Sequence, residues 1–246
     1  LKSYSSEKES ILTIGTFDGV HIGHNKILKR LIQDSKKNNL SSLVMTFFPH
    51  PRMILNKSHE IKMIDTIDEK INLLEKTGLD NLIIHPFDNN FSKIRAREFV
   101  EEILVKKLKI KEIIIGYDHK FGKDREASVE DLKKFGKDYM FTVKEIPAQE
   151  IDSIAISSTK IRNAILNGEI EKCNKFLGRN FILTGKVVYG EGLGKKIDFP
   201  TANILSGGST ISAPKFLDGN NLRTYDYVVA NPPFSSKTWS TGINPS

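Results

Sequence analysis

The chain has 246 residues, of which 39% are hydrophobic and 27% charged, a composition typical of a globular protein with a core and not of a disordered chain. No segment approaches the roughly 18 consecutive apolar residues of a membrane span, and no charged-then-apolar leader opens the chain. A single cysteine, Cys173, excludes an internal disulfide framework. We therefore expect a cytoplasmic protein that does not enter a membrane.

The net charge of +7 would suit acidic partners, but the lysines are spread along the whole chain. Their densest group, at positions 106, 107, 109 and 111, follows a predicted helix, where the helix dipole favours cations in any case. Charge alone permits nucleic-acid binding without indicating it. Nucleotide phosphates are the more economical partner.

Short apolar runs alternate with amphipathic runs over the first 156 residues. The β-prone runs predict five strands, at 11–15, 43–47, 82–85, 113–116 and 141–146. Apolar residues at i, i+3 and i+4 predict helices around 27–32, 71–74 and 99–104, and a further helix over 169–177 would bury Cys173. The pairs Thr66/Glu69 and Ser128/Asp131 predict capping boxes. This alternation predicts an α/β fold, with a mostly parallel sheet, helices on both faces and ligands at the carboxyl ends of the strands.

Residues 14–24, Ile-Gly-Thr-Phe-Asp-Gly-Val-His-Ile-Gly-His, join the first predicted strand to the first predicted helix. A tight turn into a helix gathers free backbone N–H groups, and glycines let the backbone approach a bulky anion closely. Two imidazoles, His21 and His24, can donate hydrogen bonds to a phosphate there. The stretch resembles the GxFDGxHxGH signature of the HxGH nucleotidyltransferases, which transfer a nucleotidyl group and release pyrophosphate. The alternative interpretation is a pair of surface-loop histidines or a chance metal site.

Three further segments follow the strands in chain order. Thr-Phe-Phe-Pro-His-Pro-Arg occupies 46–52, Gly-Tyr-Asp-His-Lys-Phe-Gly-Lys occupies 116–123, and Ser-Ser-Thr-Lys-Ile-Arg opens a predicted helix at 157–162. With the histidine motif they resemble the adenylyltransferase module of the bacterial bifunctional riboflavin kinase/FAD synthetases, over residues 10–204. The resemblance implies a Rossmann-like domain that transfers AMP from ATP to FMN, with Mg²⁺ bound indirectly through the ATP phosphates.

The resemblance also implies roles for individual residues. His24 would contact the α-phosphate, Arg162 the β- or γ-phosphate, and Asp118 would lie near the nucleotide and Mg²⁺. The expected catalytic residues are His21, His24, Asp118 and Arg162; the expected ATP-binding residues are Gly15, Thr16, Phe17, Asp18, Gly19, Ser157, Ser158 and Thr159; the expected flavin-binding residues are Phe47, Phe48, His50, Pro51 and Arg52.

Each role has a structural alternative. Ser157 to Thr159 could be only a helix cap, and Phe47 and Phe48 could be core residues at a strand end. His50 could be structural, because Pro49 and Pro51 frame it. Asp118 could be an ordinary turn aspartate.

From Gly178 the sequence becomes β-prone, and segments 177–179, 185–188 and 199–203 resemble the opening of the family's riboflavin kinase barrel. There Thr201 and Asn203 would hold Mg²⁺ and an ATP phosphate. Asp198 stands where the family usually has glycine, and no glutamate occurs between 204 and 246 to act as general base. We expect an adenylyltransferase domain at 1–177 and an incomplete kinase domain at 178–205, with riboflavin as a substrate only if that kinase works.

The last segment resembles a different family. Asp-Tyr-Val-Val-Ala-Asn-Pro-Pro-Phe at 226–234 is similar to the catalytic loop of the N6-adenine DNA methyltransferase subunits of type I restriction systems. No glycine-rich S-adenosylmethionine loop precedes it, so we expect 206–246 to be a foreign tail without function. Three alternatives stay open: another HxGH nucleotidyltransferase acting on a cytidine or nicotinamide nucleotide, a nucleic-acid-binding methyltransferase-like fusion, or a flavin-binding protein without turnover.

Overall fold

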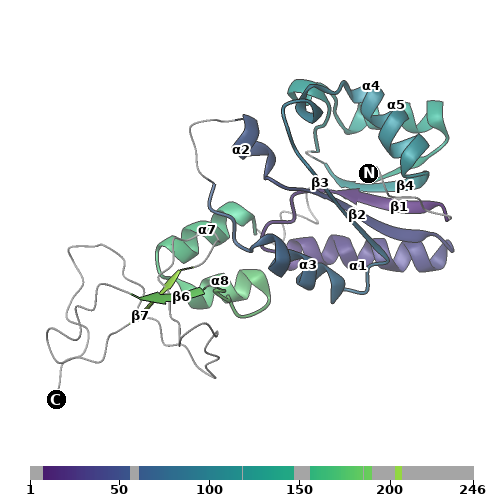
Figure 1. Cartoon of the computed structure of the whole chain (residues 1–246). Helices are drawn as coiled ribbons and strands as arrows, with labels where there is room; N and C mark the ends of the chain where they lie inside the picture. Colours follow the sequence, from purple (N-terminus) through teal and green to yellow (C-terminus); the bar gives the residue numbers. More distant parts are fainter. Residues whose placement is uncertain are drawn as a thin grey trace, which may run out of the picture. The chain divides into compact units, whose positions relative to one another are not determined.

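The computed structural model describes residues 8–55, 61–117, 119–146, 156–184, 186–189 and 203–206. The chain divides into two compact units, Leu1–Ile182 and Leu183–Ser246. In the first unit, five strands form one fully parallel sheet in the order β3-β2-β1-β4-β5 (Figure 1). The strands are β1 (Ser10–Ile14), β2 (Ser41–Phe47), β3 (Asn81–His85), β4 (Ile110–Gly116) and β5 (Thr142–Ile146). All five predicted strands are confirmed, with their ends displaced by up to three residues.

The helices that the structure describes in the first unit include every predicted one. They are α1 (Ile22–Lys37), α2 (Pro51–Leu55), α3 (Ile67–Glu75), η1 (Phe91–Lys93), α4 (Ala96–Glu98), its direct continuation η2 (Phe99–Lys107), η3 (Lys123–Arg125), α5 (Val129–Tyr139), α7 (Ser158–Leu166) and α8 (Ile170–Leu177). Both predicted capping boxes are present: Thr66 and Ser128 accept the backbone N–H three residues on, and Glu69 and Asp131 accept the N–H of the cap. The two pairs therefore set where α3 and α5 begin.

Helices cover both faces of the sheet, as predicted (Figure 1). Successive strand residues point to opposite faces, so Leu12 packs with η2 and α5, whereas Ile11 packs with α1 and α3. Both side chains are fully buried. This burial on two sides explains why the strands read as continuous apolar runs in the sequence and not as alternating ones.

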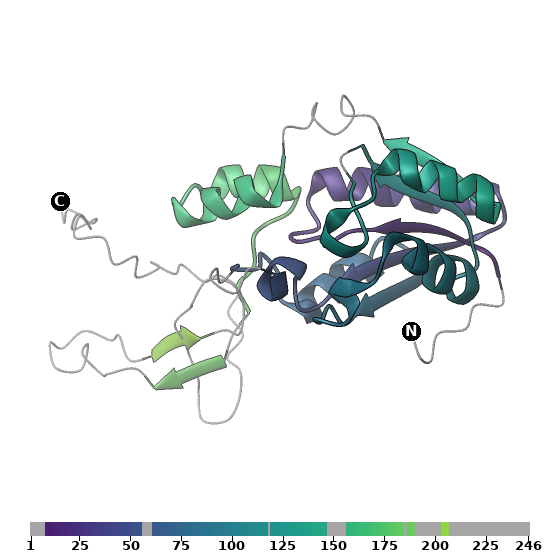
Figure 2. The same cartoon turned by 90° about the horizontal axis from the view of Figure 1, so that it is seen from above.

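The strand order places a topological switch point between β1 and β4. The chain runs from β1 outward through β2 to β3, then crosses to β4 and β5 on the other side of β1. Ligands of open parallel sheets bind at such a point, beyond the carboxyl ends of the strands. The glycine turn that follows β1 lies there, and α7 and α8 lie beside the start of α1 at the same end of the sheet (Figure 2).

Helix α8 contains the single cysteine. Cys173 is fully buried and burial raises the pKa of its thiol to about 11, so the prediction of a packing residue is confirmed. Among the helices that the structure describes, none is long and apolar enough to cross a bilayer.

In the second unit the structure describes one antiparallel pair. Strand β6 (Lys186–Tyr189) pairs with β7 (Asn203–Ser206), and Tyr189 lies opposite Asn203. Within the β-prone sequence after Gly178, residues 186–189 form a strand, whereas 181–184 have no strand structure. Thr201 and the methyltransferase-like segment at 226–234 lie outside the described residues.

Candidate functional site

The glycine turn between β1 and α1 is fixed tightly to the sheet. The Gly15 N–H donates to the Met45 carbonyl at 3.1 Å, and the Thr46 hydroxyl donates to the Thr16 carbonyl at 3.1 Å. Gly19 has φ +85°, and a Cβ added there would lie 2.9 Å from Ile64 Cδ1. At position 19, any residue with a side chain would be strained by the backbone conformation and would also clash with Ile64. Only glycine fits there without strain.

His21 begins α1 as its N-cap. Its Nδ1 accepts the backbone N–H of His24 at 3.3 Å, so in the neutral ring the proton resides on Nε2. Burial lowers the pKa of His21 to about 4, although nearby Asp18 opposes the shift. At neutral pH His21 is therefore an uncharged side chain whose Nε2–H is a hydrogen-bond donor.

The two motif histidines lie together, as the sequence predicts. Their rings stack with centroids 3.6 Å apart and planes 16° from parallel, and the Phe17 ring lies 5.0 Å from that of His24. Burial, together with the His21 and Lys70 charges, lowers the pKa of His24 well below its usual value. Within the described part of the chain, Nδ1 of His24 is buried and has no hydrogen-bond partner. A buried polar nitrogen without a partner is a place where a ligand can complete the hydrogen bonding.

Helix α7 docks on the turn through Asp18. The fully buried Asp18 carboxylate accepts the Ile64 N–H at 2.9 Å and pairs with Arg162 Nη2 at 2.9 Å. The Asp18 carbonyl accepts the Ser158 hydroxyl at 2.8 Å. Ser157 is the N-cap of α7, and Thr159 is exposed on its first turn. The motif at 157–162 and the motif at 14–24 therefore form one cluster.

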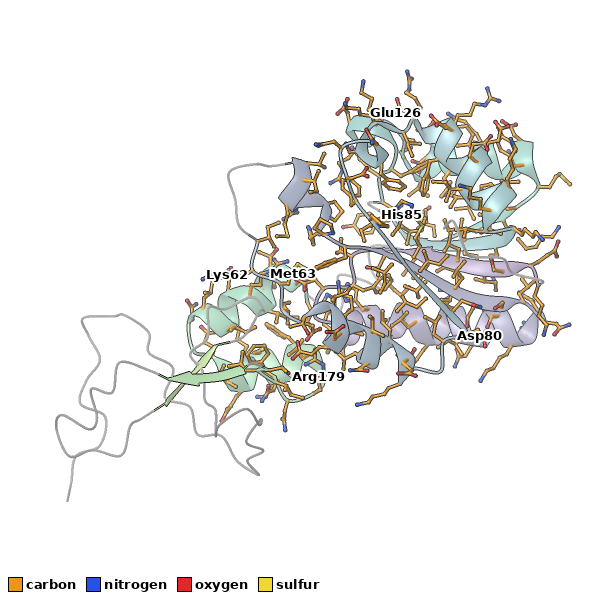
Figure 3. The ribbon with its side chains drawn as sticks, in the orientation of Figure 1. Lys62, Met63, Asp80, His85, Glu126 and Arg179 are labelled. Atoms are coloured by element: carbon orange, nitrogen blue, oxygen red, sulfur yellow. The ribbon has the colours of Figure 1, made fainter. Side chains whose placement is uncertain are left out.

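Three residues of this cluster were not among the sequence-based candidates. Lys70, only 1% exposed, donates to the Thr16 carbonyl at 2.8 Å. Arg179 donates to the Gly19 carbonyl at 3.1 Å and to Asp65 Oδ1 at 2.6 Å, and Figure 3 shows it beside the end of α8. Burial lowers the pKa of Lys70 and raises that of Asp65, with the paired charges opposing both shifts.

A sequence signal existed for Lys70 alone. It stands four residues before Leu74, and α3 buries both side chains on the same face. A lysine on the apolar stripe of an amphipathic helix is an unusual placement, so it marks a buried charge with a fixed partner. For Arg179 no local pattern pointed to the turn, because its partners lie 114 and 160 residues away.

The segment after β2 reaches the same cluster through His50. His50 is buried, its Nδ1 accepts the Arg52 N–H at 3.1 Å, and burial lowers its pKa to about 4. The pKa of His50 is also raised by the charge of Asp18 and lowered by those of Arg162, Lys70 and Arg52. His50 therefore lies within electrostatic range of the turn. As in His21, Nδ1 of His50 accepts a backbone N–H, so the proton of the neutral His50 ring resides on Nε2.

The two phenylalanines of that segment differ. The Phe47 ring lies 5.6 Å from those of Phe87 and Phe91 and, partly buried, packs against the core. Phe48 is 48% exposed and precedes Pro49 in a cis peptide bond. Pro51 and the exposed Arg52 begin α2. The exposed residues of this segment are free to contact a ligand.

Some expected residues are not placed. Asp118 and Thr201 lie outside the described residues, and of Asn203 only the backbone, as the first residue of β7, is described. Among the residues that the structure does describe, no three His, Cys, Asp or Glu side chains gather as a metal site. Among the described residues, the structure therefore offers no third ligand that would make His21 and His24 part of a metal site.

A parallel sheet with this histidine turn at its switch point defines a Rossmann-like nucleotidyltransferase domain. The comparisons with known proteins agree: residues 3–160 match the family model of FAD synthetase, and residues 177–218 match that of riboflavin kinase. The chain belongs to the FAD synthetase family, which confirms the resemblance drawn from the motifs.

Relatives of this chain carry both activities in their names. The bifunctional riboflavin kinase/FMN adenylyltransferase of Buchnera aphidicola subsp. Schizaphis graminum is 41% identical over 79% of this chain and 63% of its own length. The Escherichia coli K12 protein of the same name is 34% identical over 82% of this chain and 64% of its own length. A crystal structure described as a macrolide-efflux protein from Streptococcus pneumoniae superposes with a TM-score of 0.74 at 31% identity, covering 87% of this chain and 69% of that one. The chain therefore spans less than two thirds of the length of the two curated relatives, from Buchnera aphidicola and Escherichia coli.

Proposed function

We propose that the first unit transfers AMP from ATP to FMN, forming FAD and pyrophosphate. The observation that carries the proposal is the stacked His21–His24 pair at the start of α1, beside the switch point of a FAD synthetase-family sheet. The named activity of the relatives supports the choice of FMN over a cytidine or nicotinamide nucleotide as acceptor.

In this reaction an oxygen of the FMN phosphate attacks the α-phosphorus of ATP. The bond from that phosphorus to the bridging oxygen of the β-phosphate breaks, and pyrophosphate leaves with the negative charge. The protein must hold the two reactants in line and stabilise charge on the phosphoryl oxygens. Neutral His21 and His24 would act as hydrogen-bond donors to the α- and β-phosphate oxygens, and the free N–H groups of the first turn of α1 would add to them.

The cluster suggests a division of labour among the other candidates. Arg162 has one guanidinium nitrogen on Asp18, and its buried Nε lacks a hydrogen-bond partner in the described structure, so the side chain is held in place with a donor to spare. We assign it to the β- or γ-phosphate. Both carboxylate oxygens of Asp18 already accept hydrogen bonds, one from the Ile64 N–H and one from Arg162. Asp18 would therefore act by holding Arg162 in place. Gly15, Thr16, Phe17 and Gly19 would shape the same turn.

On the flavin side we place the segment after β2. His50 would offer its Nε2–H, while the exposed Phe48 and Arg52 would contact the ring system and the phosphate of FMN. Phe47 would support this surface from the core. Ser158 would fix α7, whose exposed Thr159 is free to meet the triphosphate.

Mg²⁺ belongs to this proposal as an ion that arrives on the ATP phosphates. Mg²⁺ commonly keeps several waters and is bound through substrate phosphates with few protein ligands, so it needs no cage of side chains. When bound it would neutralise the triphosphate and the leaving pyrophosphate. The expected contribution of Asp118, and of Thr201 and Asn203 in the second unit, stays a prediction.

The test is a pair of assays on the full 246-residue chain with Mg·ATP, one given FMN and the other riboflavin. We expect FAD and pyrophosphate from FMN, and no FMN from riboflavin, because the kinase match covers only 177–218. ATP binding without FAD formation would contradict the proposed acceptor. Conversion of riboflavin to FMN would contradict the expected loss of the kinase. The tail hypothesis is tested by S-adenosylmethionine binding, which we expect to be absent.

A further inference from the structure

Three carbonyl groups of the glycine turn are held by side chains from three different parts of the chain. The Thr16 carbonyl accepts from Lys70 at 2.8 Å, and the Asp18 carbonyl accepts from Ser158 at 2.8 Å. The Gly19 carbonyl accepts from Arg179 at 3.1 Å. Two of the three donors are cations that are largely buried beneath the turn.

Holding these carbonyls fixes the orientation of the peptide units of the turn. A peptide unit is planar, so a carbonyl fixed toward the body of the protein turns the N–H of the next residue away from it. The N–H after the Gly19 carbonyl is that of Val20, and it donates to the Phe17 carbonyl at 3.2 Å, so this peptide unit is held at both its C=O and its N–H just before His21. Val20 is held at φ +35°, a conformation that costs free energy outside glycine and persists only where neighbouring contacts impose it.

Arg179 is the donor at this last position, and it is anchored in turn. Its Nη2 lies 2.6 Å from Asp65 Oδ1, and Asp65 is only 4% exposed. Leu177 packs close to Gly19 from the same end of α8, 3.4 Å from where a Cβ would be. The guanidinium therefore joins the end of α8, the segment before α3 and the turn that presents the histidines.

We propose that Arg179 is a positioning residue for adenylyl transfer: paired with Asp65, it holds the Gly19 carbonyl and thereby aims His21 and His24 at the ATP phosphates. Arg179 lies beyond residue 160, where the FAD synthetase match ends, and within the riboflavin kinase match at 177–218. The inference rests on the proposed function, and it makes the adenylyltransferase site depend on a residue from the region matched to the kinase.

The experiment separates positioning from folding with four variants of the full chain. Arg179→Met alone leaves Asp65 as a buried charge without its partner, which destabilises the protein. The double variant Arg179→Met/Asp65→Asn removes that buried charge but still lacks a donor to the Gly19 carbonyl. Arg179→Lys keeps a cation with a different reach. Lys172→Met, in α8, the helix that precedes Arg179, removes an exposed cation paired with Glu169 and is the matched control.

We expect the double variant to regain most of the thermal midpoint that Arg179→Met loses, while its kcat stays at least tenfold below that of the wild type. The KM for FMN should change less than twofold, because we place the flavin on the segment after β2, which these substitutions do not alter. Arg179→Lys should recover part of kcat. The ¹⁵N imidazole signals of His21 and His24, recorded without ligand, should shift in the double variant and stay unchanged in Lys172→Met.

The proposal is overturned if kcat follows the thermal midpoint in every variant, or if the double variant keeps wild-type histidine signals. A wild-type chain that makes no FAD would contradict the proposed function instead. The ligand-free histidine signals would then still decide the role of Arg179, because they do not depend on the acceptor.

Discussion

Two histidines of the site are fixed by the same local device. In His21 and in His50, Nδ1 accepts a backbone N–H two or three residues on, which leaves Nε2 as the protonated nitrogen. Burial lowers the pKa of both rings to about 4. The site therefore works with neutral donors at pH 7, and the positive charge near the turn comes from Lys70, Arg162 and Arg179.

These pKa values predict how stability depends on pH. An unfolded histidine titrates near 6.5, whereas folding lowers the pKa of His21 and His50 to about 4, so between these values the unfolded chain binds more protons. Stability is then full above pH 6.5 and is lost as the pH falls toward 4, by at most about 3 kcal/mol for each group.

Urea unfolding at pH 7.5, 5.5 and 4.5 measures this dependence. The variant His50→Gln, which removes one titrating ring, should lose less stability over this range than the wild type. An equal loss in both proteins would mean that His50 does not titrate as described.

The catalytic role of His24 gives a second prediction at this scale. His24→Ala removes a donor to the phosphate, and the loss of one such donor reduces kcat by about 100-fold or more. The fold should persist, because the α1 cap uses the backbone N–H of residue 24 and not its side chain. Lys29→Ala, on the exposed side of the same helix, is the control and should leave FAD formation unchanged. Near-normal activity of His24→Ala, measured by FAD chromatography, would refute the role.

The turn between β1 and α1 is the element on which the site depends, and its glycines can be separated experimentally. Gly19 and Gly78 have similar backbone angles, φ +85° and φ +80°, but a Cβ at Gly19 would contact Ile64 at 2.9 Å, whereas one at Gly78 would meet nothing within 4 Å. Gly78→Ala therefore has only the conformational cost, about 1 kcal/mol. Gly19→Ala adds steric strain and displaces the turn.

We expect Gly19→Ala to lower the thermal midpoint more than Gly78→Ala and to reduce FAD formation, which Gly78→Ala should spare. Differential scanning calorimetry and the FMN assay measure both effects. Equal destabilisation by the two variants would show that Ile64 moves aside and that the turn does not need glycine for contact.

The elements could be predicted because their signals are local. Apolar runs such as 43–47 gave the strands, and side chains three residues apart, such as Thr66 and Glu69, gave the helix starts. The site could be predicted only where the motif itself enters it, as with His21 and His24. The roles of Lys70 and Arg179 were not predicted, because a charged residue in an amphipathic helix or just after its end gives no local sign of its distant partner.

On the scale of the whole molecule, the described contacts of the site all lie in the first unit. That unit runs to Ile182, past the domain end at 177 expected from the sequence, and it includes Arg179. The second unit contributes a described β6–β7 pair that is antiparallel, unlike the sheet of the first. The boundary between the two family matches and the boundary between the two compact units are therefore different.

Two shortened chains test this boundary. A chain ending at Ile182 retains α8 and Arg179, so it should form FAD with the KM values of the full chain. A chain ending at Gly168 loses α8, with its buried Cys173 and Leu177, and also the donor to Gly19, so it should be destabilised and inactive. Activity in the shorter chain, assayed with FMN and Mg·ATP, would show that α8 is dispensable.

The enclosed thiol of Cys173 has a practical consequence. Because it is fully buried and its pKa is raised to about 11, it stays protonated and shielded from maleimide or iodoacetamide reagents at pH 7. A cysteine introduced at the exposed Leu166 would then be the reactive one among the described residues. A fluorophore attached there would follow the helices beside the turn during turnover, with no native cysteine to remove first.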